Sequence, residues 1–221
     1  KTDFLATISH ELKTPLASSD IGLTLLERAG ADPLSTEQRA IVTDLRKDHQ
    51  RLTRIVGELL DLAQAETGHI RLNMGEPLVP TIIADALDAV KAAAQQKNIR
   101  FDTRIHFDDA RARADADKAV WVLVNLLSNA VRHSPEGGII SINARCQEHQ
   151  VAITVSDQGP GIPAEEQARV FQRFAPGTTA PHGSGLGLSI AREFMSAMGG
   201  YIAFDKSTTG ASFTLHFLPA R

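Results

Sequence analysis

The 221-residue sequence lacks the features that mark several large classes of protein. Its single cysteine, Cys146, cannot form an internal disulfide or build a zinc site, which is typical of a reducing compartment. Lys and Arg number 23 against 26 Asp and Glu, and a net charge of -3 without a basic block disfavours a nucleic-acid binder. No apolar run approaches the roughly 18 residues that a membrane-spanning helix needs. The chain also lacks a starting Met and a secretion signal and opens inside a helical pattern, so we expect a fragment.

Residues 1–66 instead follow a helical rhythm. From Ile41 onward, apolar residues recur in alternating steps of four and three, a heptad pattern typical of a helix that packs along its whole length. The apolar members of this seam are Ile41, Leu45, Leu52, Ile55, Leu59 and Leu62. Only Asp48 interrupts the seam.

A similar spacing predicts a first helix, which ends at the turn 30–33. Ser35 and Gln38 have the spacing of a capping box for the second helix, and Gly68 predicts its end. Two long helices joined by a short turn form an antiparallel hairpin, and one hairpin cannot bury both seams. We therefore expect a homodimer with a four-helix bundle, the alternative being two helices docked on the rest of the chain.

From about residue 70 the pattern changes to alternation. Residues 140–143, 151–156 and 213–217 alternate apolar and polar side chains, as half-buried strands do. Helical stretches lie between them, near 78–96, 115–133 and 187–198. Since strands and helices interleave without a strict βαβ order, an α+β sandwich is favoured over a doubly wound sheet.

His10 is the first candidate for chemistry. It lies two positions from both Ile8 and Leu12 of the first seam, and at about 100° per residue it points roughly 200° away from that seam, into solvent. Glu11 can hold one ring N–H and leave the other nitrogen as a nucleophile, since an imidazole with a pKa near 6.5 is largely unprotonated at neutral pH. Thr14 lies one turn further on the same face. The alternative is an exposed histidine without a function.

Two glycine-rich segments are candidates for nucleotide binding. Asp157 ends the predicted strand 151–156, and Gly159 and Gly161 after it let a ligand approach the backbone. An aspartate there suits the amino group of a base, and an ordinary turn is the alternative. Segment 183–188 opens a predicted helix, whose N-terminal N–H groups attract phosphate. Its glycine spacing differs from the dinucleotide-binding fingerprint, and no common phosphate-loop motif occurs in the sequence.

An amide pair is the third candidate. Asn125 and Asn129 lie four residues apart in a predicted helix and share one face. Their carbonyl oxygens could hold Mg²⁺, which prefers hard oxygen ligands in the company of phosphates, and Arg132 adds a cation for the same phosphates. The alternative is a pair that ties neighbouring backbone together.

Six motifs taken together resemble the boxes of bacterial sensor histidine kinases of two-component systems. Residues 4–17 resemble the H-box, 125–134 the N-box, 157–162 the first glycine box, 170–174 the F-box, 183–188 the second glycine box and 210–213 the terminal glycine box. The boxes follow the order of the family and cover essentially the whole chain.

The resemblance implies a domain organisation. Residues 1–67 would form the dimerisation and phosphotransfer hairpin, residues 68–76 a linker and first strand, and residues 77–221 an ATP-binding α+β two-layer sandwich of the Bergerat or GHKL type. His10 would be the phosphoacceptor and Glu11 its acid–base partner. Thr14 would position water in the phosphatase motif of the family.

The resemblance also implies which residues bind ATP and Mg²⁺. Mg²⁺ would bind at Asn129 and Asn125. The residues implied at the nucleotide are Asn125, Asn129, Arg132, His133, Asp157, Gly159, Gly161, Ile162, Phe174, Gly183, Ser184, Gly185, Leu186, Gly187, Leu188 and Ser212. Three positions depart from the family pattern, since Arg132 replaces a lysine, His133 an aromatic residue, and Pro176 a common arginine.

The function implied is ATP-dependent phosphorylation of His10 and transfer of the phosphoryl group to an aspartate of a response regulator, with phosphatase activity toward that regulator. Two alternatives are a protein that acts mainly as this phosphatase and a GHKL ATP-binding clamp without histidine phosphorylation. By resemblance, we expect the cytoplasmic part of an inner-membrane protein, with the membrane reached only through upstream segments.

Overall fold

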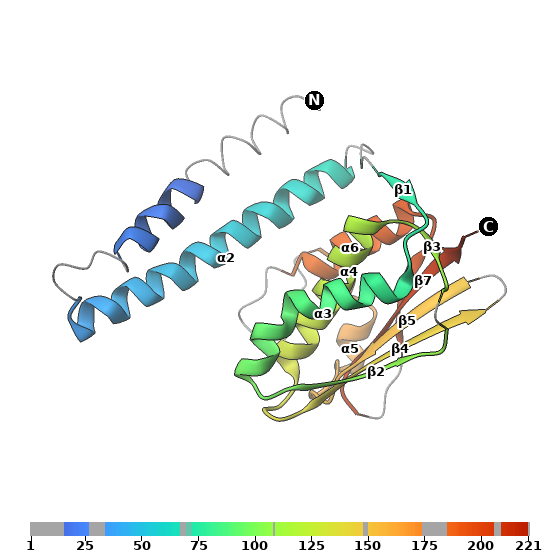
Figure 1. Cartoon of the computed structure of the whole chain (residues 1–221). Helices are drawn as coiled ribbons and strands as arrows, with labels where there is room; N and C mark the ends of the chain where they lie inside the picture. The colour runs from blue at the N-terminus through green and yellow to red at the C-terminus, as the bar shows by residue number, and fades with distance from the viewer. Residues whose placement is uncertain are drawn as a thin grey trace. The chain divides into compact units, whose positions relative to one another are not determined.

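The computed structural model of the chain describes residues 16–26, 34–66, 70, 72–107, 109–147, 150–173, 185–205 and 209–220. The chain divides into two compact units, Lys1–His69 and Ile70–Arg221 (Figure 1). No helix within the described ranges is both long enough and apolar enough to cross a membrane.

The first unit contains a helix over residues 16–26 and the long helix α2 (Thr36–Glu66). The predicted capping box at the start of α2 is confirmed. The Gln38 N–H donates to Ser35 Oγ at 3.2 Å, and the Ser35 N–H donates to Gln38 Oε1 at 2.9 Å. The predicted end at Gly68 lies outside the described residues.

The face of α2 that meets the first helix is largely polar. Val42 is buried, but Arg46 donates to Asp20 Oδ1 and to Thr24 Oγ1, both at 3.2 Å. One turn further, the His49 side chain is only 12% exposed. The inward face thus runs one residue C-terminal to the apolar seam that the sequence shows.

The seam itself points away from the hairpin interior. Ile41, Leu45 and Leu52 are 51–55% exposed in the single chain. In the first helix, Leu26 of the predicted seam is 49% exposed, and Ile21 and Leu25, which lie outside that seam, are 60% and 63% exposed. The hairpin therefore presents an apolar face on both helices that its own fold leaves uncovered.

The second unit is a mixed sheet with helices. Its strands are β1 (Met74–Gly75), β2 (Arg100–Ile105), β3 (Ala112–Asp115), β4 (Ile139–Gln147), β5 (Gln150–Ser156), β6 (Tyr201–Asp205) and β7 (Ser212–Pro219). Its helices are α3 (Val79–Gln96), α4 (Ala116–His133), the short α5 (Ala164–Gln167) and α6 (Gly187–Ala197). The order is β1-β3-β7-β5-β4-β2, with β6 also paired to β7; all pairs are antiparallel except β2 with β4.

The helices α3, α4 and α6 cover one face of this sheet (Figure 1). On β5, Val151, Ile153 and Val155 are buried, whereas the residues between them are half-buried. Trp121 of α4 meets Phe194 of α6 edge to face at 5.2 Å between ring centroids, which fixes how these two helices pack. This confirms the predicted α+β two-layer sandwich.

Candidate functional site

The helix α4 carries the amide pair. Asp115 caps its N-terminus by accepting the Lys118 N–H at 3.0 Å. Further along, Asn129 Nδ2 donates to Asn125 Oδ1 at 3.2 Å, and both side chains are half-buried. The bond uses the carbonyl oxygen of Asn125 and leaves that of Asn129 available to a ligand.

This donor set fits Mg²⁺ bound together with phosphates. Mg²⁺ commonly takes one or two protein oxygens and completes its shell with water and substrate phosphate oxygens. Across the described ranges, no group of three or more His, Cys, Asp or Glu side chains could hold a metal by itself. A Mg²⁺ ion at the amides of Asn129 and Asn125 would therefore depend on the nucleotide for further ligands.

The start of α6 lies directly against this pair. A Cβ added at Gly187 would lie 2.4 Å from Asn125 Nδ2, so only glycine fits there without a shift of the amide. Gly185 has a φ of 69°, and Leu186 is 1% exposed and anchors the turn. The N–H groups of the first turn of α6, which have no partner within the helix, therefore begin close to Asn125, as a phosphate site requires.

Asp157 follows β5 and is held by the backbone on two sides. Its Oδ1 accepts the Gly159 N–H at 2.8 Å and the Ala211 N–H at 3.1 Å, while its own N–H donates to the Ala211 carbonyl at 2.9 Å. Oδ2 makes no hydrogen bond to any described residue, which leaves one carboxylate oxygen for an amino group of a ligand. Gly210 completes this arrangement, because a Cβ there would lie 1.9 Å from the Asp157 carbonyl oxygen.

The first glycine box packs between the end of α4 and the terminal glycine box. A Cβ at Gly159 would lie 2.7 Å from the His133 carbonyl oxygen. Gly161 has a φ of 75°, and its Cβ would lie 3.0 Å from the Gly210 carbonyl oxygen. These close approaches bring three motifs together around Asp157, although they lie far apart in the sequence.

His133 is held neutral in this setting. Burial lowers its pKa most, the charges of Arg132 and Lys97 lower it further, and the charge of Asp157 opposes them. Its ring therefore adds no full charge beside Asp157 at neutral pH. Arg132, one position earlier, is half-buried as well.

The remaining predicted site residues divide into three groups. Ile162 and Leu188 are half-buried in the described part of the glycine boxes. Ser212 Oγ hydrogen-bonds Ser156 Oγ at 2.9 Å, so this hydroxyl already has a partner in the sheet, and its role at a nucleotide stays a prediction. The residues that lie outside the described residues are His10, Glu11, Thr14, Phe174, Gly183 and Ser184, together with the segment 177–182.

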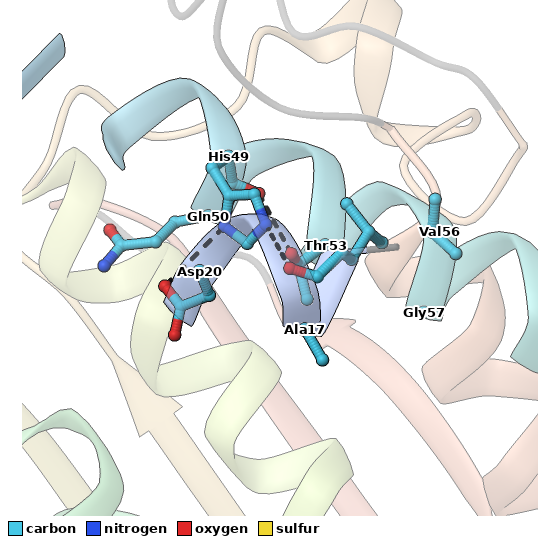
Figure 2. Close-up of a pocket in the computed structure, with 8 residues that line it drawn as sticks. Ala17, Asp20, His49, Gln50, Thr53, Val56 and Gly57 are labelled. Atoms are coloured by element: carbon cyan, nitrogen blue, oxygen red, sulfur yellow. Dashed lines mark hydrogen bonds and ion pairs between the residues drawn. The ribbon is translucent and has the colours of Figure 1, made fainter. Parts of the chain in front are cut away.

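Two residues that no sequence motif includes contact these motifs in the structure. His49 lines a pocket of the hairpin, where Nε2 donates to the Leu16 carbonyl at 2.8 Å and Nδ1 lies 3.8 Å from Asp20 Oδ1 (Figure 2). The other lining residues are Ala17, Gln50, Thr53, Val56 and Gly57. Lys97 contacts the end of α4. A one-residue offset from the apolar seam was the only signal for His49, and no local signal marked Lys97.

Comparison with known families defines the class of the two units. Residues 1–68 match the His Kinase A (phospho-acceptor) domain family. Residues 114–221 match the family described as histidine kinase-, DNA gyrase B-, and HSP90-like ATPase. The second unit is therefore an ATPase domain of the GHKL type, preceded by a phosphoacceptor domain.

Similar proteins narrow this class. Sensor-like histidine kinase SenX3 of Mycobacterium tuberculosis is 36% identical over 225 residues, covering 100% of this chain and 54% of SenX3. Circadian input-output histidine kinase CikA of Thermosynechococcus vestitus is 33% identical and covers 100% of this chain but 31% of CikA. The chain thus spans about half or less of the length of these relatives.

Solved structures agree. Full-length ShkA in complex with AMPPNP aligns with a TM-score of 0.80 and 28% identity, covering 99% of this chain and 46% of ShkA. The catalytic domain of histidine kinase ThkA aligns with a TM-score of 0.61 and 29% identity, covering 66% of this chain and 96% of that domain. The chain belongs to the sensor histidine kinases of bacterial two-component systems.

Proposed function

We propose that the chain uses ATP to phosphorylate His10 and passes the phosphoryl group to an aspartate of a response regulator. The observation that carries the proposal is the convergence of a buried carboxylate, an amide pair and a helix N-terminus in one unit. Asp157 offers one free oxygen, the Asn129 carbonyl is available, and α6 begins against Asn125. These are the groups needed to bind a base, a cation and phosphates.

The proposed reaction consists of two successive displacements at the γ-phosphorus. A neutral nitrogen of His10 attacks the γ-phosphorus, so an N–P bond forms, the bridging O–P bond breaks and ADP leaves. Glu11 holds the proton of the other ring nitrogen and stabilises the positive charge that develops on the ring. A carboxylate oxygen of the regulator then attacks the same phosphorus, the N–P bond breaks and His10 is restored.

Positioning and charge stabilisation carry most of such a transfer, because its loose transition state needs little covalent help. Arg132 and the N–H groups of α6 would neutralise phosphate oxygens. Mg²⁺, when bound at Asn129 and Asn125, would supply further positive charge there. Asp157 would select an adenine base by accepting from its amino group.

We also propose that the hairpin makes the chain a homodimer. The described apolar residues of the α2 seam are 51–55% exposed in the single chain, and Ile21, Leu25 and Leu26 of the first helix are 49–63% exposed, as expected of a surface that becomes buried in a dimer. A second copy carries the same seams, so four helices can bury them together.

Phosphatase activity toward the regulator is a second proposal, supported by the sequence Glu11-Leu-Lys-Thr14. Thr14 would position the water that attacks the phosphorylated aspartate. Replacing Thr14 with alanine should abolish loss of phosphate from the regulator and spare the labelling of His10. A loss of both activities would contradict the assignment. We further propose, from the family resemblance, that the chain is the cytoplasmic part of an inner-membrane sensor and that the membrane is reached only through upstream segments.

Incubation with γ-labelled ATP and Mg²⁺ tests the main proposal. The parent chain should acquire an acid-labile label, and His10→Ala should acquire none. His106→Ala removes an exposed histidine from the second unit and should label like the parent. Equal labelling of the parent and His10→Ala would refute histidine phosphorylation, and ATP binding without any label would favour the clamp alternative.

A further inference from the structure

Lys97 makes a three-point contact with the end of α4. Its ammonium donates to the carbonyl oxygens of Val131 at 3.0 Å, Arg132 at 2.7 Å and Ser134 at 3.1 Å. The last carbonyls of a helix have no partner within the helix. The three donors of one lysine thus satisfy acceptors at the C-terminus of α4, where the helix dipole also favours a cation.

The position of Lys97 is itself fixed. It is the C-cap residue of α3, and its N–H donates to the Ala94 carbonyl at 3.2 Å. Its own carbonyl accepts the Gly137 N–H at 2.9 Å, which closes the turn that follows α4. Lys97 therefore joins the end of one helix to the end and exit of another through both its side chain and its backbone.

The segment that Lys97 holds belongs to the candidate site. The Arg132 carbonyl is one of the three acceptors of the ammonium, and His133 lies between two of them in the sequence. The His133 carbonyl is the group that a Cβ at Gly159 would meet at 2.7 Å. The last turn of α4 is thus fixed by Lys97 and by the glycine box beside Asp157. A shift of this turn would move both side chains that face a nucleotide under the proposed function.

We propose that Lys97 is a positioning residue of the nucleotide site, which holds the last turn of α4 so that Arg132 and His133 meet the ligand. The inference rests on the proposed function. Lys97 acts through the backbone of α4 and does not itself contact the ligand.

The charge of Lys97 has a second consequence. Among the charged groups that act on His133, Arg132 and Lys97 lower its pKa and Asp157 raises it. Removing the Lys97 charge should therefore raise the pKa of His133, with burial and Arg132 still acting. This shift reports on the local electrostatics and is separate from any change in overall stability.

Three variants of the whole chain test the proposal. Lys97→Met removes the ammonium. Lys97→Arg keeps the charge but replaces the three donors of one ammonium with a planar guanidinium. Lys91→Met is the control, because it removes an exposed lysine from α3. Affinity for a non-hydrolysable ATP analogue with Mg²⁺ is measured by calorimetry. The pKa of His133 is measured by NMR, and thermal unfolding is followed in parallel.

We expect Lys97→Met to bind the analogue roughly tenfold or more weakly, the size of one or two lost hydrogen bonds, and to show a raised pKa of His133. Lys97→Arg should keep the parental pKa and recover part of the affinity, and Lys91→Met should match the parent. If Lys97→Met does not fold, Lys97→Arg carries the test through its intermediate affinity. Parental affinity in either Lys97 variant would overturn the inference alone, whereas no binding by the parent would overturn the proposed function with it.

Discussion

The exposed seam of the hairpin predicts that a pair of lysines on the seam dissociates the homodimer, whereas a matched pair off the seam leaves it intact. The perturbation is the double variant Leu45→Lys with Leu52→Lys. These leucines lie seven residues apart on α2 and are 51% and 54% exposed in the single chain. If the seam is the interface of a homodimer, both positions become buried on assembly.

The expected loss of dimerisation free energy follows from the apolar area of the two leucines that assembly would bury. Full burial of a leucine side chain contributes roughly 1.5–3 kcal/mol, so covering the exposed half contributes about 1 kcal/mol. Two leucines in each of two protomers then account for about 4 kcal/mol, which is roughly a thousandfold in the dissociation constant. The buried ammonium groups add to this loss, so a thousandfold is the smaller expectation.

The assay is sedimentation equilibrium over a range of protein concentrations, with helicity followed by circular dichroism. Thr43→Lys with Gln50→Lys is the matched control, since both residues are exposed on α2 and also lie seven apart, off the seam. The parent and the control should be dimers, and the seam variant should be a monomer that keeps its helices. A monomeric parent, or equal dissociation of control and seam variant, would refute the reasoning.

Two smaller predictions concern the second unit. Gly187→Ala should weaken nucleotide binding about tenfold or more in calorimetry, because its Cβ would lie 2.4 Å from the Asn125 amide, whereas Gly75→Ala meets nothing within 4 Å and should bind like the parent. Ser134→Ala should be neutral or stabilising by up to about 1 kcal/mol in urea unfolding, since its buried hydroxyl has no hydrogen-bond partner among the described residues. Ser189→Ala breaks a 2.7 Å hydrogen bond of a buried hydroxyl and should cost about 1–2 kcal/mol; equal effects at the two serines would contradict this reasoning.

The strands that the sequence predicted are those with a buried face. On β5 every second residue is fully buried, and the alternation was therefore visible in the sequence. The strands β2, β3 and β6 were missed. β2 and β6 lie at edges, where solvent reaches one side, and β3 has only four residues, too few to show a repeating pattern. β2 reads Arg-Phe-Asp-Thr-Arg-Ile and has no fully buried residue, so its alternation is too weak to detect.

The candidate site also has a part that the sequence predicted and a part that only the fold explains. Asn125 and Asn129 could be paired from sequence because both lie on one helix. The contact of Asp157 with Ala211 spans 54 residues and depends on the register that places Ser156 opposite Ser212. Pattern analysis identified the motifs at both ends, but only the pairing of β5 with β7 explains why a glycine must stand at position 210.

The hairpin shows why an apolar heptad does not reveal its own partner. The interior of the hairpin is built around Arg46 and His49, whose bonds to Asp20, Thr24 and the Leu16 carbonyl are satisfied within one chain. A search for hydrophobic periodicity passes over such positions and selects the seam one residue away. Polar groups need hydrogen-bond partners at fixed positions, and Arg46 and His49 have theirs within one chain. The apolar seam has no such directional requirement, so a second copy can cover it. The same division predicts that lysines on the seam act on assembly, whereas loss of Arg46 or His49 acts on the hairpin itself.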